Sequence, residues 1–202
     1  MSSQSSQPPR TNGRAKVKKR AVDRVFEVAS DLFYRESIRA VGVDTIVKQA
    51  GVAKISLYRN FDSKDDLIVA YLENRNADYW RNVDQILATK GSDPRAQLRA
   101  LIDYVGGRTT TPGYRGCPFI NYASEFPDAS HPGHQVVDEN KREMRRRLVN
   151  LTKTIGALRP AQLADALFLL IEGAYASSQT LGGRSGPAAN LFWAAEALIQ
   201  AA

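Results

Sequence analysis

The stretch that decides the fold runs from Gly42 to Phe61 and reads GVDTIVKQAGVAKISLYRNF. Apolar residues recur in its first half at the spacing of one helix face, and Gly51 then interrupts the pattern where a helix needs a left-handed residue at its end. A second short helix is predicted from Lys54 to Phe61, with Leu57 turned inward. Two helices joined by such a tight turn have the layout of a helix-turn-helix, a motif that places its second helix in the major groove of DNA.

The side chains predicted to point outward from the second helix are rich in hydrogen-bonding groups. They are Lys54, Ser56, Tyr58, Arg59 and Asn60. Comparable helix pairs occur in bundles that never touch DNA, so the apolar pattern by itself is only moderately specific. The polar outer face favours DNA binding, because Lys and Tyr suit phosphate oxygens while Ser and Asn suit base edges.

The composition is that of a globular protein. The chain has 202 residues, of which 43% are hydrophobic and 24% charged, enough to bury one large or two small cores. Its formal net charge of +7 favours a polyanionic partner, either nucleic acid or an anionic membrane surface.

The one cysteine, Cys117, excludes an intramolecular disulfide, and no stretch resembles a membrane span or a signal peptide. We therefore expect a cytoplasmic protein with no membrane partner.

The positive charge is concentrated at the start of the chain. Residues 1–20 carry six basic residues and no acid. Residues 1–17 are predicted to be a disordered basic arm, which remains solvated, lies along phosphates or a minor groove, or does both. The arm lacks the interleaved Trp, Phe and Leu residues by which amphipathic segments enter lipid, and this argues against a membrane anchor.

Along the rest of the chain, apolar residues recur at the three-and-four spacing of amphipathic helices, and no stretch indicates a strand. The pattern predicts an all-α fold of about nine helices, with a three-helix head in residues 18–63 and a helical bundle in residues 64–202. The long fourth helix, capped by Asp62 and Ser63, joins the two. The predicted helices lie at about 18–35, 43–50, 54–61, 64–90, 94–105, 117–126, 137–155, 161–181 and 187–199, with a loop at 106–116.

The head, the connecting helix and the helical remainder together resemble the TetR family of bacterial transcriptional regulators. The most specific stretch is VDTIVKQAGVAKISLYRNFDSKDDLIVAYL, residues 43–72, with its Leu57-Tyr58-x-x-Phe61 core and the Ser63-Lys64 pair. A second segment, GCPFINYASEFPD at residues 116–128, is similar to one in a subset of the family. The resemblance implies a DNA-binding domain at 18–63 and a ligand-binding and dimerisation domain at 64–202. It also implies a repressor that a small apolar or amphipathic ligand releases from a palindromic operator.

The resemblance also assigns DNA contacts to individual positions. Tyr58 and Lys64 suit phosphates, and Asn60 suits the edge of a base, adenine in particular. The implied DNA-contacting residues are Thr45, Lys54, Ile55, Ser56, Tyr58, Arg59, Asn60 and Lys64. The chain departs from the family pattern at Ala53, where a Ser or Thr often caps the second helix, and the loss of such a cap weakens a helix by about 1 kcal/mol.

The resemblance further implies a ligand pocket in the second domain, and pockets between bundle helices are lined mainly by apolar and aromatic side chains. The candidates are Trp80, Tyr104, Cys117, Phe119, Tyr122, Phe126, Met144, Phe168 and Tyr175. Each of them has the alternative of being ordinary core. A ligand held there would act by favouring one arrangement of the heads over another.

The last two predicted helices carry more apolar residues than one bundle face needs. A two-fold dimer through them would use the surplus and would present two heads to a palindromic operator, with half-sites about 34–36 Å apart or a multiple of that. The candidate interface residues are Leu167, Leu170, Ala174, Ser177, Leu191, Ala195 and Leu198. The alternative is an ordinary buried helical hairpin.

A rival interpretation is an enzymatic or small-molecule-binding helical bundle that uses Cys117, His131 and His134. A thiol and two imidazoles three positions apart are groups that can hold zinc or attack a substrate. Their placement argues against this, because the histidines flank Pro132 and Gly133 in a predicted loop while the cysteine lies on an apolar helix. We therefore expect no catalytic residue, no metal, no cofactor and no enzyme activity.

Overall fold

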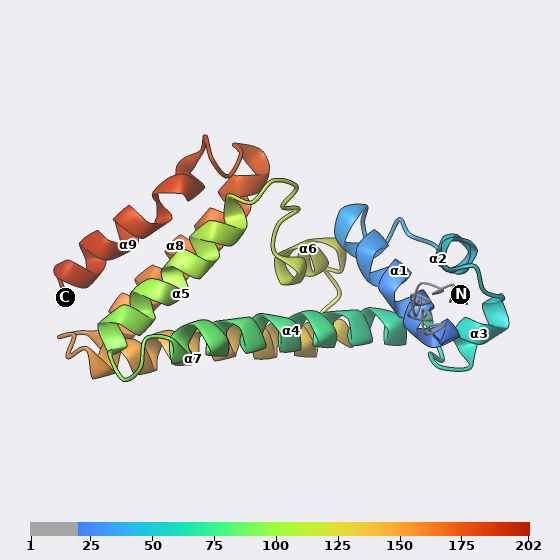
Figure 1. Cartoon of the computed structure of the whole chain (residues 1–202), viewed down its shortest axis with the longest axis horizontal. Helices are drawn as coiled ribbons and strands as arrows, with labels where there is room; N and C mark the ends of the chain where they lie inside the picture. Colours follow the sequence, from blue (N-terminus) through green and yellow to red (C-terminus); the bar gives the residue numbers. More distant parts are fainter. Residues whose placement is uncertain (1–19) are drawn as a thin grey trace, which may run out of the picture.

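The computed structural model describes residues 20–202, and the predicted basic arm, residues 1–17, lies outside the described residues. Over residues 20–202 the chain forms nine α-helices, one short 3-10 helix and no strand, which confirms the all-α prediction (Figure 1). None of these helices combines the length and the apolar character that crossing a membrane requires. The helices form a head near the N-terminus and a larger body, joined by one continuous helix.

The head consists of three helices that share one apolar core. They are α1 (Ala21–Arg35), α2 (Val43–Ala50) and α3 (Lys54–Tyr58). Leu32, Ile46 and Leu57, one from each helix, are all buried. Because none of these short helices can bury its apolar face alone, the head forms as a unit.

The fourth helix, α4 (Lys64–Ala88), leaves the head and runs along the body (Figure 1). Its start is capped as predicted, since Ser63 Oγ accepts a hydrogen bond from the Asp66 amide at 3.1 Å. Tyr71 in its first half and Val83 in its second half are both buried. One helix therefore contributes to the cores of both parts, and a shift of α4 moves the head.

The body is built from the remaining helices. They are α5 (Pro94–Thr109), α6 (Pro118–Glu125), α7 (Gly133–Thr154), α8 (Pro160–Thr180), the 3-10 helix η1 (Pro187–Asn190) and α9 (Leu191–Gln200). α7 and α8 pack along each other, α7 also packs on α4, and α5 contacts α4, α7, α8 and α9. The short α6 lies between the body and the head (Figure 1).

The structure corrects the predicted extent of α3. The helix ends at Tyr58, before the predicted end at Phe61. Arg59 and Asn60 form a turn instead, and the Asn60 side-chain amide donates a hydrogen bond to the Ser56 carbonyl at 3.0 Å. Helix ends often close in this way, because the last carbonyls have no partner in a following turn.

Three boundaries in the body are also corrected. α7 begins at Gly133, before the predicted start at 137, so His134 lies in the helix and not in the predicted loop. The predicted loop at 106–116 is helical as far as Thr109, whose hydroxyl donates to the Gly106 carbonyl at 2.9 Å. The last predicted helix, 187–199, divides into η1 and α9. Its first turn is tightened to a 3-10 helix, with the Ala189 amide bonded to the Gly186 carbonyl at 3.2 Å, as is frequent at helix starts.

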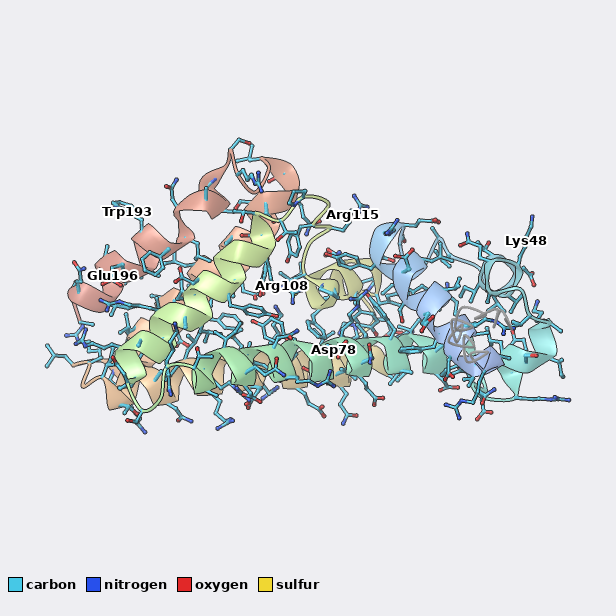
Figure 2. The ribbon with its side chains drawn as sticks, in the orientation of Figure 1. Lys48, Asp78, Arg108, Arg115, Trp193 and Glu196 are labelled. Atoms are coloured by element: carbon cyan, nitrogen blue, oxygen red, sulfur yellow. The ribbon has the colours of Figure 1, made fainter. Side chains whose placement is uncertain are left out.

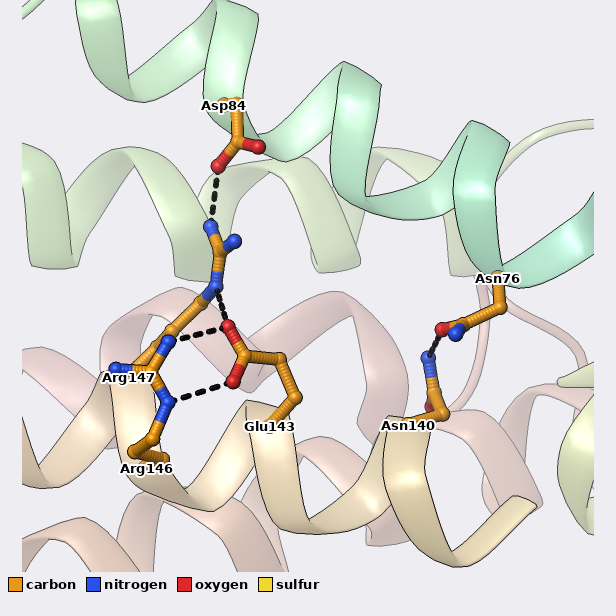
Figure 3. Close-up of polar contacts among 6 residues, drawn as sticks. All are labelled: Asn76, Asp84, Asn140, Glu143, Arg146 and Arg147. Carbon is orange, nitrogen blue, oxygen red and sulfur yellow. Dashed lines mark hydrogen bonds and ion pairs between the residues drawn. The ribbon is translucent and has the colours of Figure 1, made fainter. Parts of the chain in front are cut away.

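Polar side chains hold α7 against α4 (Figure 3). Asn140 donates a hydrogen bond to Asn76 at 2.9 Å. Arg147 reaches from α7 to Asp84 on α4, and its Nε donates to Glu143 at 2.6 Å. Because Glu143 holds the guanidinium from its own helix, Arg147 is fixed at the contact and joins the two helices.

Candidate nucleic-acid interface and ligand cavity

The turn between α2 and α3 is made by Gly51, which takes the left-handed conformation at φ 62° and ψ 44°. Glycine fits here without strain, because at this φ any other side chain crowds the backbone. The Val52 amide donates to the Val47 carbonyl at 3.1 Å and so satisfies an acceptor at the end of α2. The turn sets the direction in which α3 leaves α2.

α3 buries one side chain completely and exposes the residues on its other faces. Leu57 is the buried one, whereas Ile55 is 60% and Tyr58 42% exposed. The other exposed residues are Lys54, Arg59 and Asn60, with Ser56 half-buried. Ile55 and Tyr58 are large side chains whose exposure does not serve the packing of the head. They share an accessible surface with polar groups, as expected of a binding face.

Lys54 connects α3 to the start of α2. Its ammonium forms an ion pair with Asp44 at 2.9 Å, and both side chains remain largely exposed. The hydrogen bond and the charge of Asp44 raise the pKa of Lys54, so the lysine stays cationic. Thr45 is exposed beside Asp44. Lys48, which the sequence analysis did not single out, also projects from α2 into solvent (Figure 2), but a lysine on a solvated helix face carries no sequence signal.

Lys64, the first residue of α4, differs from the rest of the predicted set. Its ammonium donates to the Ile38 carbonyl at 2.6 Å, in the connection between α1 and α2, and lies 5.9 Å from the Phe33 ring centroid. Burial lowers the pKa of Lys64, as expected for an ammonium partly withdrawn from water. The side chain ties α4 to the head, and a phosphate contact would require it to leave this carbonyl.

The body encloses a cavity of about 270 Å³ lined by α4, α5, α7, α8 and the chain at the start of α6. The predicted pocket residues that line it are Cys117, Phe119, Met144 and Tyr175. Tyr79 was not predicted but also lines it, and its hydroxyl lies 3.4 Å from that of Tyr175. The volume is close to the lower end, about 300 Å³, of small-molecule sites in proteins.

The other predicted pocket residues lie outside this cavity. They are Trp80, Tyr104, Tyr122, Phe126 and Phe168. Trp80 is covered by the Arg147 guanidinium, which lies 4.4 Å from its ring centroid. Tyr122 and Phe126 stack on each other with centroids 4.9 Å apart. Aromatic residue type alone does not show which side chains line the cavity, because aromatic residues also pack in the core.

The cavity is more polar than the predicted set implies. Six charged residues line it that were not predicted for it: Arg75, Asp78, Arg81, Arg108, Lys141 and Glu172. Arg108 reaches from α5 toward α4 (Figure 2) and donates to the Tyr104 hydroxyl at 3.0 Å. The sequence does carry a signal for Arg108, because it follows Leu101 and Val105 on the buried face of α5 and is thus a charge on an apolar stripe.

The residues of the rival interpretation are engaged separately. The Cys117 thiol is buried. His131 Nδ1 lies 2.5 Å from the Tyr122 hydroxyl, and His134 Nε2 lies 2.7 Å from the Phe126 carbonyl. Within residues 20–202, no three His, Cys, Asp or Glu side chains are grouped so that they could hold a metal ion.

The body also leaves large apolar side chains on its surface. Trp193 of α9 is 74% and Leu169 of α8 70% exposed, and Trp193 points away from the body (Figure 2). Both line a groove between the two helices, together with the predicted interface residues Leu170, Ala174, Ser177 and Leu191. Leu167 and Ala195 are buried within the bundle, and Leu198 packs against its core. Neither Trp193 nor Leu169 is among the predicted interface residues, because both lie off the buried stripes that periodicity detects.

A three-helix head whose third helix, α3, exposes polar side chains is joined here by one long helix to a bundle that holds a cavity. This arrangement defines a helix-turn-helix, DNA-binding regulator of transcription. Residues 25–71 match the family described as bacterial regulatory proteins, tetR family, and residues 94–191 match the tetracyclin repressor-like C-terminal domain. The chain belongs to the TetR family. This confirms the resemblance, and because the family is not enzymatic, the enzymatic interpretation is set aside.

Curated relatives are similar over part of their length. The chain is 35% identical over 78 residues to the HTH-type transcriptional repressor KstR2 of Rhodococcus jostii (strain RHA1). The matched stretch covers 39% of this chain and 38% of that protein. It is 37% identical over 75 residues to the HTH-type transcriptional activator FasR of Mycolicibacterium smegmatis. That match covers 37% of this chain and 34% of that protein. The chain thus matches less than half the length of these relatives, of which one is a repressor and one an activator.

Solved structures match nearly the whole chain. The crystal structure of SCO4454, a TetR-family transcriptional regulator from Streptomyces coelicolor, has a TM-score of 0.81 at 29% identity and covers 90% of this chain and 95% of that one. A transcriptional regulator (sav143) from Streptomyces avermitilis ma-4680 has a TM-score of 0.73 at 29% identity, over 88% of this chain and 99% of that one. Head, connecting helix and body therefore share the arrangement of these relatives.

Proposed function

We propose that this protein acts as a homodimer in the cytoplasm, binds a palindromic operator through its two heads, and releases the operator when a small molecule occupies the cavity. It would thereby work as a repressor. One observation carries the proposal: Arg75 lines the cavity, and its guanidinium also contacts α1 of the head. A single side chain thus links the cavity to the DNA-binding part.

The proposed DNA contacts are those of the α3 surface and its surroundings. Tyr58 would donate its hydroxyl to a phosphate, and Asn60 would meet a base edge in the major groove. The full set comprises Thr45, Lys54, Ile55, Ser56, Tyr58, Arg59, Asn60 and Lys64. Lys64 has the weakest support, because its ammonium already donates to the Ile38 carbonyl. At that position the backbone amides of the α4 start would serve a phosphate instead.

The dimer is proposed to form through α8 and α9. A two-fold contact buries the same patch on both copies, and an exposed apolar patch is a common mark of such a contact. Trp193 and Leu169 would lose their exposure in this dimer, and the small residues Gly173, Ala174 and Ser177 beside them would let the helices approach closely.

Contacts between body and head supply a path from the cavity to the operator. Arg75 Nη2 donates to the Ser30 carbonyl at 3.4 Å, and its guanidinium lies 5.0 Å from the Tyr34 ring centroid. Arg115 lies in the loop before α6 (Figure 2). Its amide donates to the Tyr34 hydroxyl at 3.1 Å. Its Nε donates to the Arg35 carbonyl at 3.1 Å. A ligand that moves Arg75 or this loop would shift α1 relative to the body.

The test is selection of genomic fragments by the purified full-length protein, followed by titration of the best binder at two salt concentrations. We expect a palindromic sequence, bound with nanomolar affinity that weakens as salt rises. The control is Ile55→Glu, which puts a negative charge on the exposed α3 surface and should abolish operator binding without unfolding the head. An absence of enriched sequences, or undiminished binding by the variant, would contradict the proposal.

A further inference from the structure

We propose that the ligand of the cavity is a small aromatic carboxylate, with its carboxylate held by Arg108 and its ring placed among the aromatic side chains of the wall. The inference rests on the proposed function, in which this cavity holds the effector. It narrows the apolar or amphipathic ligand that the family resemblance implies to an amphipathic anion, because the charges that line the cavity do not balance.

The two acidic residues of the cavity wall are already paired. Asp78 accepts a hydrogen bond from Arg81 at 2.7 Å. Glu172 accepts one from Lys141 at 2.6 Å. Each pair is neutral as a unit, so neither supplies a countercharge for the other cations of the wall. Those cations are two arginines, one on α4 and one on α5.

Arg75 and Arg108 are the two cations without a countercharge. No acidic side chain of residues 20–202 lies within ion-pair distance of either guanidinium. Arg108 is half-buried, donates to the Tyr104 hydroxyl, and lies 5.5 Å from the centroid of the Tyr79 ring. A guanidinium stays charged at physiological pH, and a partly buried charge without a partner favours the entry of an anion.

Two buried hydrogen-bond donors of the wall also lack acceptors. Arg75 Nε and the Tyr114 hydroxyl are buried and have no hydrogen-bond partner in the described part of the chain. Burial raises the pKa of the Tyr114 phenol, so the hydroxyl keeps its proton and can donate. Buried donors without acceptors are unfavourable, and a carboxylate can accept several hydrogen bonds at once. Arg75, Arg108 and Tyr114 therefore all favour the same kind of ligand group.

The rest of the wall suits a flat ring. Tyr79, Tyr175, Phe119 and Met144 line the cavity, and aromatic and thioether side chains pack well against an aromatic ring. The volume of about 270 Å³ is just under the lower end, about 300 Å³, of sites for drug-sized ligands. The cavity therefore fits one ring with a short acid group better than a long acyl chain or a large polycyclic compound.

A carboxylate held by Arg108 would also act on the head if it bonded to Arg75, which lines the same cavity. The hydrogen bond from Arg75 to the Ser30 carbonyl of α1 is long, at 3.4 Å. Charge-assisted hydrogen bonds to a carboxylate are shorter and stronger than bonds to a neutral carbonyl. A carboxylate bonded to Arg75 would draw the guanidinium away from α1 and release one of the contacts that hold the head to the body.

The test uses the full-length protein and two readouts, calorimetric titration and thermal unfolding. The probes are benzoate, phenylacetate and 4-hydroxybenzoate, the neutral isostere benzamide, the cation benzylamine, and sulfate. We expect the aromatic acids to bind and to raise the melting temperature, and benzamide and benzylamine to bind at least about tenfold more weakly. Arg108→Gln should remove the preference for acids over benzamide. Arg95→Gln, at an exposed arginine of the same helix, should leave that preference intact.

Tyr114→Phe serves as a second variant, because it removes one hydroxyl and leaves the charge and packing of the wall in place. It should weaken binding of the acids by about tenfold and of benzamide by less, because a hydrogen bond to an ionised carboxylate is stronger than one to a neutral amide. Benzamide binding as tightly as benzoate, sulfate binding in place of the acids, or no acid binding at millimolar concentration would overturn the ligand class. Operator binding is measured separately on the same preparation, so a failure of the acids leaves the DNA-binding function standing, whereas loss of operator binding concerns the proposed function itself.

Discussion

Ser37 donates a hydrogen bond to Glu125 at 2.8 Å, and the two residues are 88 positions apart in the chain. The same carboxylate oxygen accepts from the Arg39 amide at 2.9 Å, and the Arg39 guanidinium donates to the Glu125 carbonyl at 3.1 Å. Ser37 and Arg39 lie in the connection between α1 and α2, while Glu125 is the last residue of α6. The orientation of the head is therefore set by α6 as well as by α4.

Replacing Glu125 with alanine should loosen this junction without unfolding either part. Two hydrogen bonds to one partly buried carboxylate are lost, and bonds to charged groups contribute roughly 1.5–3 kcal/mol each. We expect the Arg39 amide to exchange with deuterium at least about tenfold faster in Glu125→Ala, as a local opening that leaves the helices protected. Hydrogen exchange measured by NMR or mass spectrometry follows this segment directly.

The control is Glu139→Ala, because Glu139 is an exposed residue of α7 that accepts a hydrogen bond from Gln135 of the same helix at 2.9 Å. The exchange rate of the Arg39 amide should not change in this variant. Equal rates in the wild type and in Glu125→Ala would show that the α6 contact does not hold the head.

Ala53 is a position at which the head can be stabilised. It has the extended backbone of a helix cap, with φ −74° and ψ 147°, but no side chain that caps α3. Ala53→Ser should satisfy a free amide of α3 and stabilise the protein by about 1 kcal/mol. In a chain of this size, that gain raises the melting temperature by about 2–4 °C, which circular dichroism can measure.

Gly51→Ala should act in the opposite direction. At φ 62° an L-residue is disfavoured by about 1–2 kcal/mol. No neighbouring atom lies within 4 Å of the added Cβ, so the loss comes from the backbone conformation and not from a clash. We expect a lower melting temperature, again by a few degrees. An unchanged melting temperature in both variants would mean that the α2–α3 turn does not limit stability.

Trp193→Glu should convert the proposed dimer into monomers. The side chain is 74% exposed in the single chain, so the change is tolerated there, but a second copy would bury the new charge without a partner. Sedimentation or light scattering gives the mass in solution. Ile55→Glu makes the same kind of change on the head and should leave the dimer intact. A Trp193→Glu variant that remains dimeric would place the interface elsewhere on the molecule.

Tyr58→Phe and Asn60→Ala should separate positioning from base reading. Removing the Tyr58 hydroxyl should weaken operator and random DNA by the same factor, about fivefold for one hydrogen bond of about 1 kcal/mol. Asn60→Ala should cost about 1–3 kcal/mol on the operator and relax the preference at one base pair. Titrations against the operator, its single-base variants and random DNA measure both effects. Equal losses on all three for Asn60→Ala would contradict the base-reading role.

The helix-turn-helix head could be predicted from the sequence because its determinants are local. Ile46 and Ala50 recur at helix spacing, and both are buried in the structure. The Gly51 turn and the Ser63 cap involve neighbours only a few residues away. The residue types at these two positions therefore indicate the backbone conformation. The all-α fold and the TetR family follow from the same patterns. The individual DNA contacts remain predictions.

The role of Lys64 shows where such local information ends. The family resemblance predicts a phosphate contact for it, yet its ammonium donates to the Ile38 carbonyl, which is 26 positions away in the chain. Which acceptor lies within reach of a long side chain depends on how α1 and α4 cross. No pattern within either helix contains that information.

The charge balance of the cavity likewise depends on the tertiary structure. Arg108 follows an apolar stripe, so the sequence indicates that it is turned inward, but not whether an acid meets it there. Lys141 forms an ion pair with Glu172 on α8, whereas no acidic residue between positions 20 and 202 forms one with Arg108. Periodicity is a property of one helix and states which face is buried. The charge balance of a cavity is a sum over several helices, and only their packing determines it.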